Sequence, residues 1–309
     1  MAHTGGHLPG AHSSSSGWGS RDRAPRAVPA PPPVPAPSAE PAPSAVPALP
    51  ALPAESLRPT RWPDESSTGV PTGTVLTASD GLYITSPGVI VSGLDVVGNI
   101  EIRAENVTIE DSRITGKVEV FSAGAVLRRI EIVGPGTSGA GEHAVGWANY
   151  SCDACNVHGW GKGFYMEDNV TITNSWVHDL SVIGDPSSDG SHNEAIYTQG
   201  GSDFTIINNR LDAGDAPNFS SSVSLFGQQR AVQNALVQGN LLNGGGYCLY
   251  AGYESGIPPV NTRYLNNTFG TDMHADCGEF GPATGYYGGN GNRWAGNVRP
   301  NGTEVAAPD

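Results

Sequence analysis

An eleven-residue pattern of apolar and polar positions recurs along this chain and can be written eight times without gaps. In the row NVTITNSWVHD (residues 169–179) the second and fourth positions are apolar with a polar residue between them, and the ninth position is apolar again. Apolar residues two apart predict a strand with one buried face. The rows begin at Gly88, Asn106, Gly124, Asn149, Asn169, Asp203, Asn234 and Asn261. Self-similarity at such a period indicates a solenoid.

Each row turns at a small or polar sixth position, such as Gly93 or Asn174, and a second short strand follows. Row starts lie between 18 residues (88 to 106) and 34 residues (169 to 203) apart, which suits one coil of a parallel β-helix. No long run has the 3.6-residue periodicity of an α-solenoid. The seventh position is asparagine in three consecutive rows, at Asn209, Asn240 and Asn267, and this predicts a hydrogen-bonded side-chain ladder at the turn.

Two rows and the segment after one of them resemble a known family. NVTIEDSRITG (106–116) and NVTITNSWVHD (169–179), followed by HNEAIYTQGG (192–201), are similar to right-handed parallel β-helix proteins of the pectin-lyase-like superfamily, bacterial and secreted. The likeness extends over residues 62–302. It implies an all-β chain forming a single right-handed parallel β-helix, and it implies a polysaccharide partner. The arginine base of pectate lyases and the paired aspartates of polygalacturonases are not recognisable, so the resemblance does not select an activity.

Three segments are expected. Residues 1–60 hold 14 of the 25 prolines and are predicted to be a disordered Pro/Ala/Ser-rich tether. Residues 61–302 form the β-helix and residues 303–309 a flexible tail. Within the β-helix, residues 61–86 are expected to cap the first coil. The region after residue 271 has no visible row and is expected to cap the last coil.

The net charge of −14, with 16 lysines and arginines, argues against a nucleic-acid partner and does not favour anionic lipid. No apolar run reaches the roughly 18 residues of a membrane helix. The first residues lack a signal peptide pattern. From fold and tether we expect a secreted or cell-surface protein without nucleic-acid or membrane partners. We expect a monomer, with a trimer as the alternative.

Extra residues always enter after the eleventh position of a row, in segments 134–142, 180–193 and 214–221. Insertions at one register must emerge on one edge of a β-helix, where they would wall a groove. Its floor is predicted to be strands at 143–147, 164–166, 195–199 and 223–228. The expected substrate-binding side chains are His143, Tyr197, Gln199, Phe226 and Gln228.

The densest cluster of titratable residues lies on the 180–193 loop and its exit. The candidate catalytic residues are His192, Glu194, Asp189 and Lys162. Hydrolysis would use two carboxyls, whereas β-elimination would use His192 or Lys162 as the base and a calcium ion held by Asp185, Asp189 and Glu194. Lyase and hydrolase both remain open. The rival class is a non-catalytic carbohydrate-binding, adhesin or structural β-helix.

The four cysteines form two pairs in the sequence. Cys152 and Cys155 occupy the fourth and seventh positions of one row and are interpreted as reduced core residues. Cys248 and Cys277 flank the last complete row and are a candidate disulfide, which would close a loop of about 29 residues.

Overall fold

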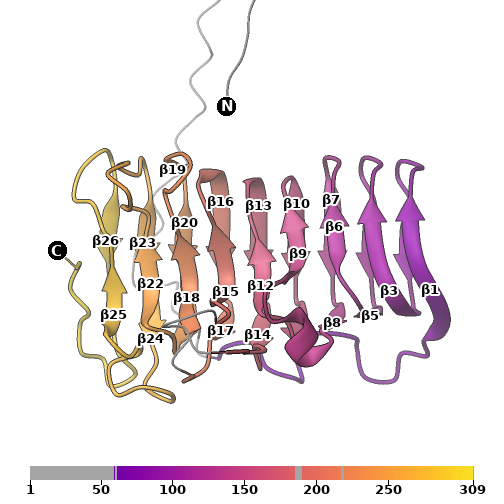
Figure 1. Ribbon diagram of the computed structural model, residues 1–309, viewed down its shortest axis with the longest axis horizontal. Coiled ribbons are helices and arrows are strands. Elements are labelled where there is room, and N and C mark those ends of the chain that lie inside the picture. The colour runs from indigo at the N-terminus through magenta and orange to yellow at the C-terminus, as the bar shows by residue number, and fades with distance from the viewer. Residues whose placement is uncertain (1–58, 60, 185–189, 217–218, 309) are drawn as a thin grey trace, which may run out of the picture. The chain divides into compact units, whose positions relative to one another are not determined.

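The computed structural model describes residues 59, 61–184, 190–216 and 219–308, which stack as the coils of a parallel β-helix (Figure 1). Every strand pair given a register is parallel, and the prediction of an all-β solenoid is confirmed. The short 3₁₀ helix η2 (Gly136–Gly139) interrupts one coil. Most of the predicted tether, residues 1–58 and 60, lies outside the described residues.

The strands form three faces. The first face contains β2 (Ile90–Ser92), β4 (Thr108–Glu110), β7 (Ala125–Arg128), β10 (Tyr150–Asp153), β13 (Asp168–Thr173), β16 (Gly201–Ile207), β19 (Val232–Gln233), β20 (Leu236–Gln238), β23 (Arg263–Leu265) and β26 (Arg293–Ala295). The second face contains β5 (Arg113–Thr115), β8 (Glu131–Val133), β11 (Asn156–His158), β14 (Trp176–His178), β17 (Arg210–Asp212), β21 (Leu241–Asn243) and β24 (Thr268–Phe269). The third, called the lateral face below, contains β6 (Val118–Val120), β9 (His143–Trp147), β12 (Lys162–Tyr165), β15 (Asn193–Thr198), β18 (Phe219–Leu225), β22 (Tyr247–Ala251) and β25 (Gly281–Thr284).

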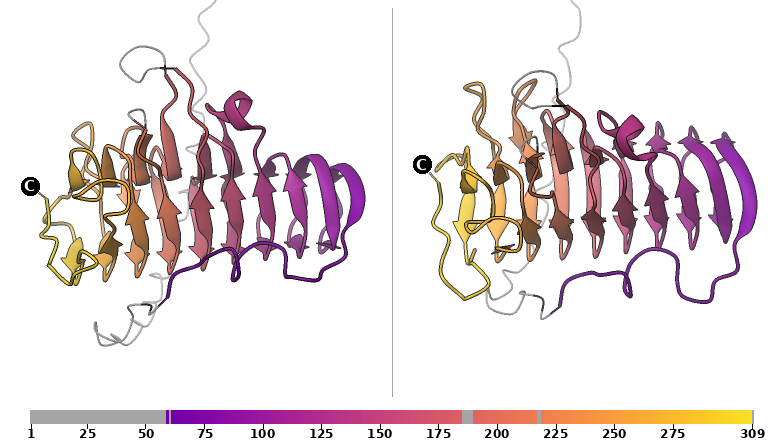
Figure 2. Two further views of the ribbon diagram at one scale, coloured as in Figure 1. Left: turned by 90° about the horizontal axis from the view of Figure 1, so that it is seen from below. Right: turned by 60° about the horizontal axis from the view of Figure 1, so that its bottom comes forward.

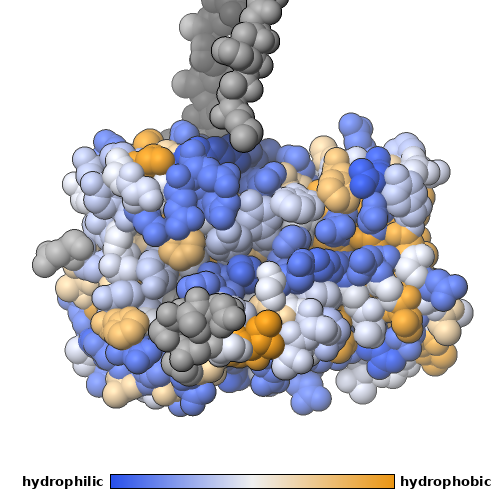
Figure 3. All heavy atoms as spheres, in the orientation of Figure 1, coloured by the Kyte–Doolittle hydropathy of each residue, from blue (hydrophilic) through white to orange (hydrophobic). Residues whose placement is uncertain are grey.

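The long strand β3 (Leu94–Ile102) joins the second and lateral faces, because its first half pairs with β5 and its second half with β6. Strand β1 (Thr77–Ile84) pairs along β3 and covers the first coil. In Figure 3 the side toward the viewer is mainly hydrophilic or neutral, and hydrophobic residues are more frequent over these first coils at the right. Val97 of β3 and Tyr83 of β1 are exposed.

The rows of the sequence stack in register, so that equivalent positions pair between coils. On the first face Leu127 pairs with Cys152, and Cys152 pairs with Ile172. All three of these fourth-position side chains are fully buried. The column continues through Tyr264 to Trp294, so the C-terminal region contains a ninth row that sequence reading missed.

The corner between the first and second faces repeats one backbone geometry. The sixth position of every row has a positive φ, at Gly93, Asp111, Arg129, Ala154, Asn174, Asn208, Gly239, Asn266 and Gly296. Glycine and asparagine are the residues that adopt this left-handed conformation most readily. The first position of each predicted row is left-handed as well, which explains its preference for Asn and Gly.

The seventh-position asparagines form the predicted ladder inside this corner. Asn240 Nδ2 donates to Asn267 Oδ1 at 3.0 Å and to the carbonyl of Ile206 at 2.9 Å. Asn240 Oδ1 accepts from both the backbone and side-chain amides of Asn209. The ladder extends to Asn297 in the ninth row. All four asparagines are fully buried.

The segment before β1 runs along the coils instead of only capping the first one. Trp62 Nε1 donates to the carbonyl of Gly239 at 3.3 Å, Gly69 N donates to the carbonyl of Ala154, and Thr77 N donates to the carbonyl of Gly93. Figure 2 shows this indigo segment following one edge of the helix back to its first coil. Beyond residue 302, Val305 is 2 % exposed and its carbonyl accepts from Trp294 Nε1.

The reduced state expected for Cys152 and Cys155 is wrong, because the structure joins them in a disulfide. The left-handed turn at Ala154 brings the fourth and seventh positions of this row together across the corner, with a Cα–Cα distance of 6.1 Å. That distance lies within the range that a disulfide spans. A second disulfide links Cys248 of β22 to Cys277.

Candidate functional site

The inserted segments share one edge of the helix. Each joins a second-face strand to the lateral-face strand that follows it, as η2 does between β8 and β9. Asn193 Nδ2 ties neighbouring segments together by donating to the carbonyls of Ala140, Gly161 and Ser181. Figure 2 shows the magenta η2 projecting from this edge. The described parts of the insertions therefore border the lateral face.

Aromatic side chains line the lateral face from coil to coil. The ring centroids of Trp147 and Tyr165 lie 5.2 Å apart, and those of Tyr165 and Tyr197 also lie 5.2 Å apart. Phe226 continues the series 6.2 Å beyond Tyr197, and Tyr250 lies 4.9 Å beyond Phe226. These five residues, called the aromatic row below, come from five successive coils.

The pleat of β12 and β15 sends the Tyr165 and Tyr197 rings outward. Phe164 pairs with Ile196 and both are fully buried, whereas the next residues, Tyr165 and Tyr197, pair with each other and are partly exposed. Successive side chains of a strand point to opposite faces, so this alternation is expected. Tyr197 and Phe226 were predicted from the sequence as binding residues, but the other three were not. Their signal was available, since each flanks a buried position of its strand.

Lys162 and Glu194 are paired neighbours in β12 and β15. The Lys162 ammonium lies 3.4 Å from Glu194 Oε2 and donates to the carbonyl of His192 at 2.7 Å. The two side chains are 17 % and 3 % exposed, so the pair is far more buried than a surface salt bridge. Lys162 Nζ also lies 5.6 Å from the centre of the Tyr197 ring. Burial, together with the Glu194 charge, raises the pKa of Tyr197 to about 12.

His143 pairs with Lys162 in the register of β9 and β12 and packs edge-on against Trp147. Burial lowers the pKa of His143 to about 4, with the Lys117 and Lys162 charges acting in the same direction. Its Nε2 is buried and makes no hydrogen bond among the described residues. The imidazole is therefore neutral near pH 7.

The other predicted site residues are distributed as follows. Gln199 accepts a hydrogen bond from Gln229, and Gln228 donates to Glu254 Oε1 at 3.2 Å. His192 is exposed and directly precedes β15 of the lateral face. Asp185 and Asp189 lie outside the described residues, so the structure places only Glu194 of the expected calcium ligands. Within the described ranges, no group of three or more His, Cys, Asp and Glu is arranged to hold a metal ion.

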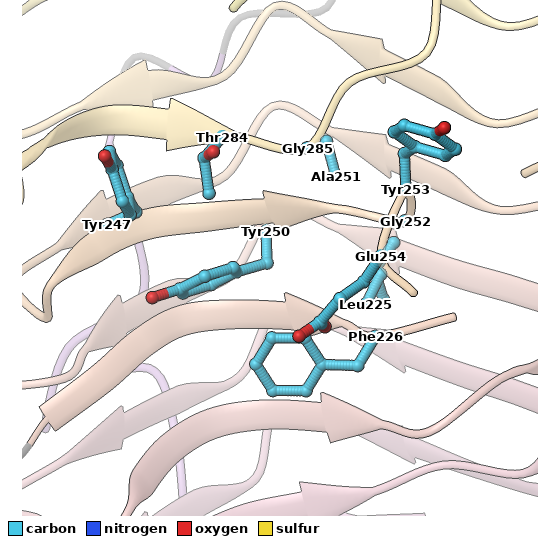
Figure 4. A pocket seen from close by; sticks show the side chains of 10 residues that line it. All are labelled: Leu225, Phe226, Tyr247, Tyr250, Ala251, Gly252, Tyr253, Glu254, Thr284 and Gly285. Atoms are coloured by element: carbon cyan, nitrogen blue, oxygen red, sulfur yellow. The ribbon is translucent and has the colours of Figure 1, made fainter. Parts of the chain in front are cut away.

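A pocket of about 260 Å³ lies at the C-terminal end of the aromatic row (Figure 4). Its lining residues are Leu225, Phe226, Tyr247, Tyr250, Ala251, Gly252, Tyr253, Glu254, Thr284 and Gly285. Figure 4 shows the Glu254 carboxylate reaching from the turn after β22 toward the Phe226 ring. This pocket was not predicted from the sequence, because its walls come from three coils and a turn that fits no row position.

We expect the stability of the protein to fall as the pH drops from about 6.5 to about 4. In this window the unfolded chain, with an ordinary histidine pKa of 6.5, binds the proton that folded His143 rejects. The penalty below pH 4 should reach about 3 kcal/mol. Chemical denaturation of wild type and His143→Gln at several pH values measures it. Parallel pH profiles for the two proteins would contradict this expectation.

No protein-family model, curated protein or solved structure matches this chain. In the part of the chain that the structure describes, no helix has the length and apolar character needed to cross a membrane.

Proposed function

We propose that this protein binds a polysaccharide chain along the lateral face and cleaves it beside Glu194. The observation that supports this most is the aromatic row, five rings from five coils at spacings of 4.9 to 6.2 Å. Aromatic rings combine an apolar face with a polar edge, which suits the apolar and hydroxyl faces of a sugar ring. Coils repeat at about 4.8 Å, so the row extends over roughly 19 Å. That length accommodates several consecutive sugar residues.

The ionisable groups beside the row are suited to cleavage. A hydrogen bond from Lys117 lowers the pKa of Glu142, which keeps this carboxylate charged. Glu142 precedes His143, whose register partner Lys162 pairs in turn with Glu194, so the two glutamates lie two coils apart. Two coils correspond to about 10 Å at the backbone, just above the carboxyl spacing of about 6.5–9.5 Å in inverting hydrolases. In the alternative elimination, Lys162 would be the base.

The fold is compatible with the superfamily that the sequence resembles. A parallel β-helix with inserted loops on one edge agrees with the proposed membership of the pectin-lyase-like superfamily. We also propose that the protein acts outside the cell or at its surface, as a monomer or a trimer.

The rival function is glycan binding without cleavage. The burial of Glu194, which is 2 % exposed, favours this rival, because a catalytic carboxylate must reach its substrate. A glycan panel separates the two. New reducing ends indicate a hydrolase, and ultraviolet absorbance from an unsaturated uronate indicates a lyase. Binding without either product indicates the rival.

Replacing Tyr197 or Tyr165 with alanine should weaken glycan binding at least tenfold, because each ring contributes about 1 kcal/mol or more of stacking. Isothermal titration against the best-binding glycan of the panel measures the change. Tyr83→Ala is the matched control, because Tyr83 is a 65 % exposed tyrosine on β1, three strands before the β9 strand that carries Trp147. Equal affinities for wild type, Tyr197→Ala and Tyr165→Ala would contradict binding on the aromatic row.

A further inference from the structure

The pocket at the end of the aromatic row combines ring walls with an unsatisfied carboxylate oxygen. Glu254 Oε1 accepts a hydrogen bond from Gln228. Glu254 Oε2 is buried and has no hydrogen-bond partner among the described residues. A buried acceptor without a donor costs about 1–3 kcal/mol. A ligand that supplied an O–H or N–H donor at this oxygen would recover that energy.

The rings beside this oxygen suit a sugar. Tyr250 packs against both Phe226 and Tyr247, with centroid distances of 4.9 and 5.7 Å. Burial raises the pKa of Tyr250, and the neighbouring Glu254 and Glu194 charges raise it further. The Tyr250 hydroxyl therefore stays protonated near neutral pH. The pocket shares the Phe226 and Tyr250 rings with the aromatic row and so continues the same binding surface.

The charges of this surface disfavour a negatively charged ligand. Cations on or beside it already form ion pairs with carboxylates, namely Lys117 with Glu142, Lys162 with Glu194, and Arg230 with Asp168. No positively charged residue lines the pocket itself, as far as the described residues show. A uronate in the pocket would place its carboxylate beside Glu254 without a cation between them. Like charges in a partly buried site repel strongly.

We infer that this pocket is a subsite for a sugar residue without a carboxylate, either neutral or an amino sugar. A hydroxyl or ammonium group of that sugar donates to Glu254 Oε2, and its ring lies against Tyr250 and Phe226. The inference rests on the proposed glycan binding by the lateral face. It adds that the bound polymer has a non-acidic residue at this position and is not a homopolymer of uronate.

The test compares three oligosaccharides of equal length with the full-length protein. Isothermal titration is carried out with a neutral xylo-oligosaccharide, a chitosan oligosaccharide and an oligogalacturonate. We expect at least one of the first two to bind ten times or more tighter than the oligogalacturonate. Glu254→Gln should reduce this difference in affinity to less than threefold, because the amide can both donate and accept a hydrogen bond. Glu105→Gln removes the same charge from an exposed site on an early coil and should leave the ratio unchanged.

The outcomes separate this inference from the proposed function. Absence of binding by all three oligosaccharides and by a wider glycan panel would overturn glycan binding as a whole. Binding of the oligogalacturonate as tight as that of the others would overturn only the pocket assignment. An unchanged ratio of the affinities in Glu254→Gln would also overturn only the pocket assignment. If Glu254→Gln loses more affinity for the chitosan oligosaccharide than for the xylo-oligosaccharide, the donor to Glu254 is an ammonium group.

Discussion

Replacing Asn240 with alanine should lower the free energy of unfolding by about 4 kcal/mol. The side chain makes four hydrogen bonds inside the corner and is fully buried. Alanine would leave the backbone amide of Asn209 and the carbonyl of Ile206 without their partners. Each buried unsatisfied group costs about 1–3 kcal/mol, and the lost side-chain volume adds a cavity. Urea denaturation followed by circular dichroism measures the difference.

Gln233→Ala is the control for this substitution. Gln233 carries the same amide group on the same coil, but its side chain is exposed. Surface substitutions of this kind usually change stability by less than about 0.5 kcal/mol. A loss below 1 kcal/mol in Asn240→Ala would show that the asparagine ladder does not stabilise the stack.

Glu194→Gln should reduce cleavage of a bound glycan at least 100-fold while the protein keeps its fold. The amide has the shape of the carboxylate but cannot transfer a proton, and general acid–base groups contribute about 10²–10⁴ in rate. Rates of product formation measure the loss, and melting temperatures show whether the fold persists. Binding should change less than cleavage, because the aromatic row is untouched.

Glu119→Gln is the matched control for cleavage. Glu119 lies on β6 of the same face and is partly exposed, so its replacement changes the charge by the same amount. Full activity in Glu194→Gln would remove Glu194 from the catalytic role. Cleavage by neither the wild type nor the variant, with glycan binding retained, would leave the non-catalytic rival as the function.

The rows and corners of the solenoid could be predicted because each position repeats a physical requirement. Asn174 and Gly239 occur where the backbone must be left-handed, and Asn209 and Asn240 where a buried turn needs a donor and an acceptor. The ninth row escaped notice because Asn292 and Arg299 occupy its second and ninth positions, which are apolar in most other rows. The disulfide of Cys152 was misread because spacing alone does not show how sharply the corner turns.

The site was only partly predictable. Tyr197 and Phe226 were found by alternation within their own strands, and Lys162 and Glu194 by their position at the looped edge. Their pairing depends on register between coils. Trp147, Tyr165 and Tyr250 also lie beside buried positions of their own strands. Only the register between coils shows that they form one row with the other two rings.

The sequence by itself determined the parallel β-helix, because a repeating row cannot bury its apolar side chains except against the next coil. It also determined which edge carries the insertions, because they all enter at one point of the row. Only the tertiary structure decided which side chains meet on the lateral face. Coil lengths vary with the insertions, so residues that touch, such as Phe226 and Tyr250, have no fixed separation along the chain. Backbone pairing across coils, which no local pattern encodes, sets those contacts.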